Sequence, residues 1–438
     1  MPLSWCLFIS LAALTSTFAA AFKKSAKNGY DNQPKLWALL VAGSKGYSNY
    51  RHQADVCHAY HVLHDHGVPD ERIVVMMYDD IAHARENPTP GMIINHPNGT
   101  DVYRGVPKDY TGDLVTPQNF LDILQGKKVK GGSGKVIHSK PIDHVFLYFA
   151  GHGAPGLLAF PNGVLHAQPF MNVIKSLNKK TFASMTIYVE ACESGSIFDG
   201  LLTAYYSVYA TTAANPYESS YACYYDAKRE AYLGNLYSVS WMEDSDKKDL
   251  KRETLFEQFS IVKKMTYASH VMEYGNLPMR NLSLSQFQGK KETSPIVLPK
   301  APDDIVSSRD VPIAILRHKL GKASNPQEMN SLKAKLRRAL SNRLFLKNKV
   351  AEIASFVARG KSNDADVVLS SQRKFTKFDC YQKAVGHFND RCFELSQNPY
   401  AFQHLRAFMN MCELSYNIFN ITEAMDLLCT HPTFVGIV

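Results

Sequence analysis

The chain has 438 residues, of which 45% are hydrophobic and 20% are charged. This composition excludes disorder, collagen and low complexity as descriptions of the whole chain, and the length allows two or three domains. Lys and Arg outnumber Asp and Glu by 49 to 40, a net charge of +9. We find no zinc-finger spacing and no RNP-type aromatic motif, so no nucleic-acid partner is predicted.

The N-terminus has the pattern of a signal peptide. Residues 1–21 contain no charged side chain, and the apolar run Leu7–Leu14 is followed by small residues ending at Ala21. We predict cleavage after Ala21; a membrane anchor is the alternative, for which the run is short. No later segment reaches the roughly 18 apolar residues that span a bilayer, so we expect no membrane anchor and a lumenal or secreted protein. Sequons predict glycosylation at Asn98, Asn281 and Asn420.

Short apolar runs alternate with helical patterns from about residue 35 to residue 280. Apolar residues recur at helical spacing in Gln53–His66 and in Gln168–Leu177. Fully apolar strands separated by helices predict an α/β fold with a mostly parallel sheet flanked by helices, in which chemistry lies at the carboxyl ends of the strands. The expected strands are Leu36–Ala42, Ile73–Tyr78, His144–Phe149, Met185–Glu190 and Val208–Thr212.

The pattern changes after about Gly289. Residues 289–312 are rich in Pro, Ser and Asp, which predicts a linker. Met329–Phe356 then has apolar residues at helical spacing, and Phe378–Cys429 also predicts helices. We therefore expect a helical C-terminal region.

The cysteines divide between these two regions. Four of them, in the last sixty residues of an exported chain, suggest two disulfides with three possible connectivities. Three others, Cys57, Cys192 and Cys223, lie upstream and leave at least one free thiol, which burial or catalysis must explain. Cys57 and His61 are spaced like two zinc ligands on a helix, but no second pair follows, so we predict no metal and no cofactor.

Two strand ends carry candidate catalytic residues. His152 follows one predicted strand between two glycines, and Cys192 follows the next strand. A thiol beside an imidazole is the pair that acyl transfer requires. The backbone N–H groups of Gly153 and Cys192 are candidates for an oxyanion hole. The alternative is a buried structural cysteine and a histidine in a turn.

Six strings of residues carry a further signal. They are Val41–Ser44, Asn49–Asp55, Met76–Ala82, Tyr148–Gly153, Glu190–Ser196 and Tyr209–Pro216. Together they resemble the legumain family of asparaginyl endopeptidases, and the resemblance continues through the C-terminal cysteines. It implies a caspase-like catalytic domain, made as a zymogen with an all-α, disulfide-linked prodomain. It also implies cleavage of peptide bonds after Asn and, at acidic pH, after Asp, in an acidic endolysosomal compartment or after secretion.

The resemblance also implies a role for individual residues. Cys192 is the nucleophile, His152 the general acid or base, and Asn49 orients the imidazole. An Asn side chain offers an acceptor oxygen and donor hydrogens, so a pocket with both a basic and an acidic group can bind both ends of it. The implied pocket residues are Arg51, His52, Glu190, Ser219, Ser220 and Asn235.

Two residues depart from the family pattern. Gly151 stands where members usually carry an Asp that is linked to ligase chemistry, so we predict hydrolysis and make no prediction of ligation. Asn235 stands where the family has an Asp in the pocket. Losing one negative charge there should reduce the repulsion of a P1 Asp, which predicts a raised ratio of Asp to Asn cleavage.

We expect the zymogen to be divided by processing. The predicted segments are signal peptide 1–21, N-terminal propeptide 22–31, catalytic domain 32–289, linker 290–325, activation peptide 326–345 and prodomain 346–438. Candidate processing sites are Asn32, Asn325 and Asn330; Pro326 makes the bond after Asn325 a poor one, so Asn330 is the better candidate. The resemblance implies the disulfides Cys380–Cys412 and Cys392–Cys429.

A basic stretch, Lys333–Lys377, holds twelve Lys and Arg against three acidic residues. Its net charge, 12 − 3 = +9, equals that of the whole chain. It is either a solvated helix face or an inhibitor held over an acidic rim of the active site, which releases when falling pH protonates the rim. The partners implied are peptide and protein substrates with P1 Asn, the chain's own prodomain and cystatin-type inhibitors. We expect a monomer.

Two other functions remain open. A GPI-anchor transamidase subunit has a similar histidine motif, but that family does not share Glu190–Ser196 or the four-cysteine tail. An inactive binding protein of the same fold is the second, which the presence of both Cys192 and His152 disfavours.

Overall fold

The computed structural model describes residues 33–294, 301–358 and 362–438. Leu36–Val438 form one compact unit. The predicted signal peptide, the N-terminal propeptide and Asn32 lie outside the described residues. Among the helices that the structure describes, none is long and apolar enough to cross a bilayer.

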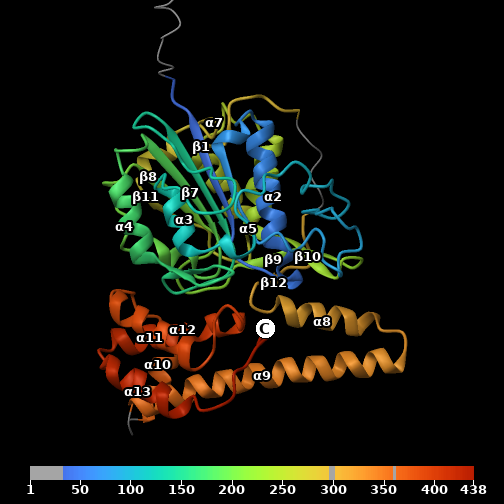
Figure 1. Cartoon of the computed structure of the whole chain (residues 1–438), viewed down its shortest axis with the longest axis vertical. Coiled ribbons are helices and arrows are strands. Elements are labelled where there is room, and N and C mark those ends of the chain that lie inside the picture. Colours follow the sequence, from blue (N-terminus) through green and yellow to red (C-terminus); the bar gives the residue numbers. More distant parts are fainter. Residues whose placement is uncertain (1–32, 295–300, 359–361) are drawn as a thin grey trace, which may run out of the picture. The chain divides into compact units, whose positions relative to one another are not determined.

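A six-stranded sheet forms the centre of the N-terminal region (Figure 1). Five strands run parallel, and β11 pairs antiparallel with β8 at one edge. The strand order is β11 (Met272–Gly275), β8 (Val208–Thr212), β7 (Ser184–Glu190), β3 (His144–Ala150), β1 (Leu36–Ala42) and β2 (Ile73–Met76). The five predicted strands are confirmed with ends that differ by at most two residues, because each is a short apolar run buried on both faces.

Helices cover both faces of this sheet. Along β1, Ala38 and Leu40 pack into one apolar cluster with α2 (Tyr50–Asp65), whereas Leu39 and Val41 point into the opposite cluster. This alternation follows from the period of two in a strand. The first face also holds α5 (Leu236–Lys247), α6 (Leu255–Met265) and α7 (Ser285–Gln288), and the second holds α3 (Pro117–Leu124) and α4 (Ala167–Leu177).

Two small three-stranded sheets lie outside the main sheet. One follows β3 directly and consists of β4 (Gly153–Ala154), β5 (Leu157–Ala159) and β6 (Val164–His166). The other has the order β10 (Ala231–Asn235), β9 (Tyr221–Asp226) and β12 (Val306–Ser307).

The C-terminal region is helical, as predicted. Its last five helices share one apolar cluster, whereas Val311 and Ile315 of the first helix pack with Ala222 and Tyr232 of the sheet that contains β12. The structure pairs Cys380 with Cys412 and Cys392 with Cys429. The helices are α8 (Val311–Lys322), α9 (Pro326–Ala358), α10 (Ser362–Ser370), α11 (Phe378–Arg391), α12 (Leu405–Glu413) and α13 (Ile418–Leu428). The predicted fold class, an α/β sheet domain followed by a disulfide-linked all-α region, is confirmed.

The segment predicted as a linker contains regular structure. Residues 306–307 form β12, and α8 begins at Val311 with Pro312 in its first turn. The composition of residues 289–312 predicts a loop up to Pro312, but a proline fits the first turn of a helix, where its missing N–H has no intrahelical acceptor. α9 begins at Pro326 and continues without a break past residue 345, so the predicted end of the activation peptide lies within one helix.

Candidate active site

The predicted nucleophile and base lie at the ends of two paired strands. β3 and β7 are parallel neighbours, with Ala150 opposite Glu190, and His152 and Cys192 each come two residues later. A Cβ on Gly153 would lie 2.5 Å from the carbonyl oxygen of Cys192, so a side chain there would push the two loops apart. Cys192 is buried and forms no disulfide.

Asn49 fixes the orientation of the imidazole. Its Nδ2 donates to the carbonyl oxygen of Lys45 (2.8 Å), which leaves its Oδ1 to accept from His152 Nε2 (2.8 Å). Because Nε2 carries the proton of that hydrogen bond, Nδ1 is the nitrogen left free to accept a proton. Burial, together with the charges of Arg51 and Arg309, lowers the pKa of His152 to about 3, so the imidazole is neutral in this state.

The predicted pocket residues Arg51, Glu190 and Asn235 are all buried. Arg51 Nε donates to Asn235 Oδ1 (2.9 Å) and its Nη1 to the carbonyl oxygen of Ser48 (3.2 Å). Ser238 donates to Glu190 Oε2 (3.2 Å). Arg51 Nη2 and Glu190 Oε1 are buried and make no hydrogen bond to the described residues. A ligand that carries both an acceptor and a donor would satisfy these two atoms.

The remaining predicted pocket residues have different positions. Ser220 donates its backbone N–H to Cys192 Sγ (3.4 Å), and the preceding Ser219 is half-buried. His52 packs its ring against that of His152, with centroids 5.0 Å apart. Burial first, and then the charge of Arg51, lower the pKa of His52 well below its usual value. His52 therefore contacts the ring of the predicted base, and its role in the pocket stays a prediction.

A segment of the chain, which we call the strap (residues 304–310), runs along the active site. β12 adds antiparallel to β9, and Ser308 donates its N–H to the carbonyl oxygen of Ser220 (2.9 Å). Ser220 in turn contacts Cys192. An extended peptide that binds by adding a strand to a sheet edge would use this same edge of β9. The strap therefore blocks the edge beside the nucleophile.

Two arginines hold the C-terminal half of the chain to Glu193, the residue after the nucleophile. Arg309 of the strap and Arg406 of α12 pair with its two carboxylate oxygens at 2.7 and 2.6 Å, and all three side chains are largely buried. Arg309 also donates to the carbonyl oxygen of Gly153 (3.1 Å). We call Glu193, Arg309 and Arg406 the Glu193 clamp. Its ion pairs are charge-assisted hydrogen bonds in a dry interface, where removing one partner is costly.

The clamp is not supplied by the basic stretch Lys333–Lys377. Both clamp arginines lie outside it, so this stretch does not supply the ion pairs at Glu193, and its role as an inhibitor stays a prediction. Seven of the members whose side chains the structure describes are solvent-exposed: Lys333, Lys335, Arg337, Arg338 and Lys347 on α9, and Lys374 and Lys377 after α10. The five on α9 fit the alternative of a solvated helix face. One member, Arg343, acts indirectly, since it pairs with Asp310 of the strap (2.6 Å) and donates to the carbonyl oxygen of Arg309 (2.7 Å).

Apolar packing adds to the clamp. Ala154, Leu157 and Ala159, from the small sheet that follows His152, belong to the same cluster as the C-terminal helices. Gly156 has no room for a side chain, because a Cβ there would lie 2.0 Å from the ring of Phe375. The helical region therefore packs directly on the loop that carries the base.

Several residues of this site were missed in the sequence. Asp55 accepts hydrogen bonds from Asn235 Nδ2 (2.6 Å) and from Asn95 Nδ2 (2.8 Å), so both belong to the pocket wall. Asp55 lies one helical turn after Arg51, a spacing that could have indicated it. Arg309 and Arg406 lie 116 and 213 residues from Glu193, and no local pattern marks them.

Other candidate sites are not brought together. Cys57 and Cys223 are buried free thiols, and His61 bonds the carbonyl oxygen of Val102 (3.0 Å). Among the described residues no three metal-ligand side chains gather. Of the sequon residues, Asn98 and Asn281 are exposed and Asn420 is half-buried.

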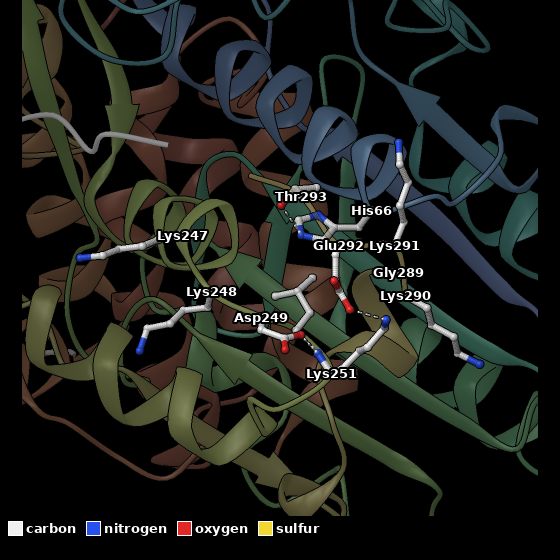
Figure 2. A pocket seen from close by; sticks show the side chains of 11 residues that line it. His66, Lys247, Lys248, Asp249, Lys251, Gly289, Lys290, Lys291, Glu292 and Thr293 are labelled. Carbon is white, nitrogen blue, oxygen red and sulfur yellow. Dashed lines mark hydrogen bonds and ion pairs between the residues drawn. The ribbon is translucent and has the colours of Figure 1, made fainter. Parts of the chain in front are cut away.

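A separate hollow of about 170 Å³ lies away from the catalytic residues (Figure 2). It adjoins α7, whose Phe287 packs against His144 at the start of β3, whereas His152 follows the other end of that strand. Lys251 and Glu292 pair across it at 2.8 Å. None of the predicted site residues lines it.

Comparisons with known proteins give consistent matches. A model of the Peptidase C13 family matches residues 36–290, and a model of the legumain prodomain matches residues 334–429. The chain is 49% identical to legumain of Homo sapiens, 43% to hemoglobinase of Schistosoma japonicum and 41% to vacuolar-processing enzyme beta-isozyme of Arabidopsis thaliana. These alignments cover 90, 90 and 91% of this chain and 93, 92 and 89% of the relatives. Caspase-1 of Spodoptera frugiperda aligns with a TM-score of 0.34 at 12% identity, over 60% of this chain and 92% of that one, which is too low to carry an argument.

Proposed function

Since the chain belongs to the Peptidase C13 family, whose members are cysteine peptidases, we propose that it is a zymogen that hydrolyses peptide bonds after Asn. The observation that carries this specificity is the pair of unused buried atoms, Arg51 Nη2 and Glu190 Oε1. A P1 carboxamide would place its oxygen on the first and its nitrogen on the second. A site that forms hydrogen bonds with both the oxygen and the nitrogen of a carboxamide strongly rejects a side chain that lacks these two groups.

The chemistry follows from the positions of His152 and Cys192. The thiol gives its proton to His152 Nδ1 and the sulfur attacks the P1 carbonyl carbon. The backbone N–H groups of Gly153 and Cys192 would stabilise the oxyanion. His152 returns the proton to the leaving amine, and water then hydrolyses the thioester with the imidazole as base. No step needs a cofactor.

Cleavage after Asp is the expected second activity. Burial, and after it the charge of Asp55, raises the pKa of Glu190 to about 8, so the carboxyl is neutral at acidic pH. A neutral Glu190 beside a neutral Asn235 does not repel a P1 carboxylate. The ratio of Asp to Asn cleavage should therefore be high at pH 5 and fall as the pH rises toward 8.

Removal of the C-terminal region is the proposed activation step. The strap and the Glu193 clamp block the site, so a substrate can bind only after both have left it. Asn330 lies inside α9, so cleavage there would first require the start of that helix to unwind, whereas Asn325 precedes the helix and accepts the N–H of Glu328 (2.8 Å). The division into catalytic domain, linker, activation peptide and prodomain remains a proposal.

The family resemblance supports further proposals of location and partners. We expect passage through the secretory pathway to a lysosome or similar acidic compartment, glycosylation at the three sequons, a monomer, and inhibition by cystatin-type proteins.

A panel of fluorogenic peptides that differ only in P1 tests the proposal. After acid activation we expect cleavage of P1 Asn, weaker cleavage of P1 Asp, and no cleavage of P1 Gln or Ala. Cys192→Ala should abolish all of it. Equal cleavage of Asn and Ala peptides, or activity that survives Cys192→Ala, would contradict the proposal.

A further inference from the structure

A chain of buried hydrogen bonds runs behind the pocket. From Arg51 it passes through Asn235 to Asp55, then through Asn95 to His58. The last link, from His58 Nδ1 to Asn95 Oδ1, is 2.7 Å long. All five residues are at most 8% exposed. At its far end His58 Nε2 lies 2.8 Å from the carboxylate of Asp246.

Each side chain in this series of hydrogen bonds can adopt only one orientation. His58 has both ring nitrogens next to acceptors, so both carry protons; Asp246 is the main cause of a pKa that lies near 9 in spite of burial. The protonated Nδ1 requires the oxygen of Asn95 to face it. The nitrogen of Asn95 is thereby directed at Asp55 and at the carbonyl oxygen of Leu233 (2.9 Å).

The orientation of Asn235, at the pocket, is fixed in the same way. The carboxylate of Asp55 is an acceptor only, so the carboxamide of Asn235 must turn its nitrogen toward Asp55. Its oxygen then faces Arg51 Nε (2.9 Å). Were this carboxamide reversed, its nitrogen would face the guanidinium, and a donor would meet a donor in a buried site.

We propose that Asp55, oriented by Asn95 and His58, is a positioning residue that fixes the Asn235 carboxamide and so directs the free Nη2 of Arg51 at the P1 side chain. This inference rests on the proposed function, since it concerns the same pocket. Asp55 has no contact with the reacting atoms and acts only through Asn235 and Arg51.

An exchange of the two residues tests it. In Asp55→Asn the two carboxamides place a nitrogen against a nitrogen, so Asn235 must reverse. In the double variant Asp55→Asn/Asn235→Asp the donor and the acceptor are exchanged, and every hydrogen bond from Asn95 to Arg51 can form again. We expect kcat/KM for a P1 Asn peptide to fall about 10- to 100-fold in the single variant, the range for a misdirected hydrogen bond to a charged group. The double variant should recover most of this loss.

The pH profile adds a second readout. Burial raises the pKa of Asp55 to about 7, against its hydrogen bonds and the charge of Arg51. Its other titratable neighbours include Cys57 on α2, Tyr148 on β3, Glu190 on β7 and Cys223 on β9. A protonated Asp55 resembles the amide of the variant, so the loss in Asp55→Asn should be largest at pH 7 to 7.5 and smaller at pH 5. A merely structural role would give the same loss at both.

Matched controls separate the pocket from the fold. Labelling of Cys192 by methyl methanethiosulfonate, which has no side chain to fill the pocket, should keep its rate in all variants. His58→Gln should lower P1 Asn cleavage about threefold to tenfold, within the range for one neutral hydrogen bond. His61→Gln, one turn on in α2, should leave it unchanged. If Asp55→Asn does not fold, the comparison of His58→Gln with His61→Gln tests the inference in its place.

Three results would overturn the inference while P1 Asn cleavage by the wild type keeps the proposed function intact. They are no loss in Asp55→Asn, no recovery in the double variant, and equal effects of His58→Gln and His61→Gln. A wild type that does not cleave P1 Asn would instead contradict the proposed function.

Discussion

Arginine is used in two settings in this protein. In the pocket, Arg51 is 1% exposed and its partners, Asn235 and Ser48, belong to the catalytic domain. At the Glu193 clamp, Arg309 and Arg406 come from the strap and the helical region and share one carboxylate. In the first arrangement both direct partners of the guanidinium are neutral groups. The second depends on one carboxylate, so the loss of Glu193 would remove two contacts together.

The largest expected effect is in the pocket. Arg51→Lys keeps the positive charge but removes the fork of donors, so Asn235 and the P1 oxygen cannot both be bound. We expect kcat/KM for P1 Asn to fall about 100-fold or more, measured after activation. Arg252→Lys, at a side chain that is 90% exposed, should change nothing. Equal activity of the wild type and Arg51→Lys would show that the guanidinium does not bind the P1 side chain.

The next effect is on release of the clamp. Arg406→Gln removes one of the two cations at Glu193, and the substitution leaves with the helical region. We expect the pH at which activation is half complete to move toward neutrality by about one unit, since breaking a buried ion pair costs several kcal/mol. Mature kcat/KM should be unaltered. Arg391→Gln, at the exposed pair with Asp426, is the matched control; an equal shift in both variants would contradict the account.

A smaller effect concerns stability of the mature domain. Burial raises the pKa of Glu190 to about 8 and that of Glu243 to about 7. Between pH 4.5 and these values the folded state holds protons that the unfolded chain releases, so stability falls as pH rises through this window, on the order of 1 kcal/mol per pH unit. The melting temperature of the mature domain should be lower at pH 7.5 than at pH 5.

Two substitutions check the sign of this effect. Glu243→Gln should make the melting temperature less dependent on pH. Glu257 caps α6, and its hydrogen bonds with Thr254 lower its pKa, so its contribution is lost only as pH falls; Glu257→Gln should leave the slope above pH 5 unchanged. A melting temperature that rises from pH 5 to 7.5 would contradict the prediction.

The smallest effect is expected on the exposed face of α9. Lys335→Gln and Arg337→Gln together remove two charges that face solvent, and neither residue belongs to the clamp. The activation pH, followed by mass and activity, should stay within error of the wild type. A shift as large as that of Arg406→Gln would restore the basic stretch as the inhibitor.

The sequence predicted those parts of the fold that depend on residues close together in the chain. Each parallel strand is a short apolar run, and His152 and Cys192 follow two of them directly, so their proximity could be inferred. The strap could not, because β12 is two residues long and pairs with a strand about 85 residues earlier. The hydrogen bond from Asn235 to Asp55 joins residues 180 positions apart, and the family resemblance did not indicate that Asp55 belongs to the pocket.

The most direct test of the central claim uses an electrophilic probe with an Asn side chain at P1. The zymogen at pH 7 should take up little probe, because the strap and the Glu193 clamp block the site, and the same protein taken to pH 4 should be labelled at Cys192 with loss of the helical region. Cys192→Ala should not be labelled. Rapid labelling of the intact zymogen at pH 7, or labelling of the Cys192→Ala variant, would contradict the account.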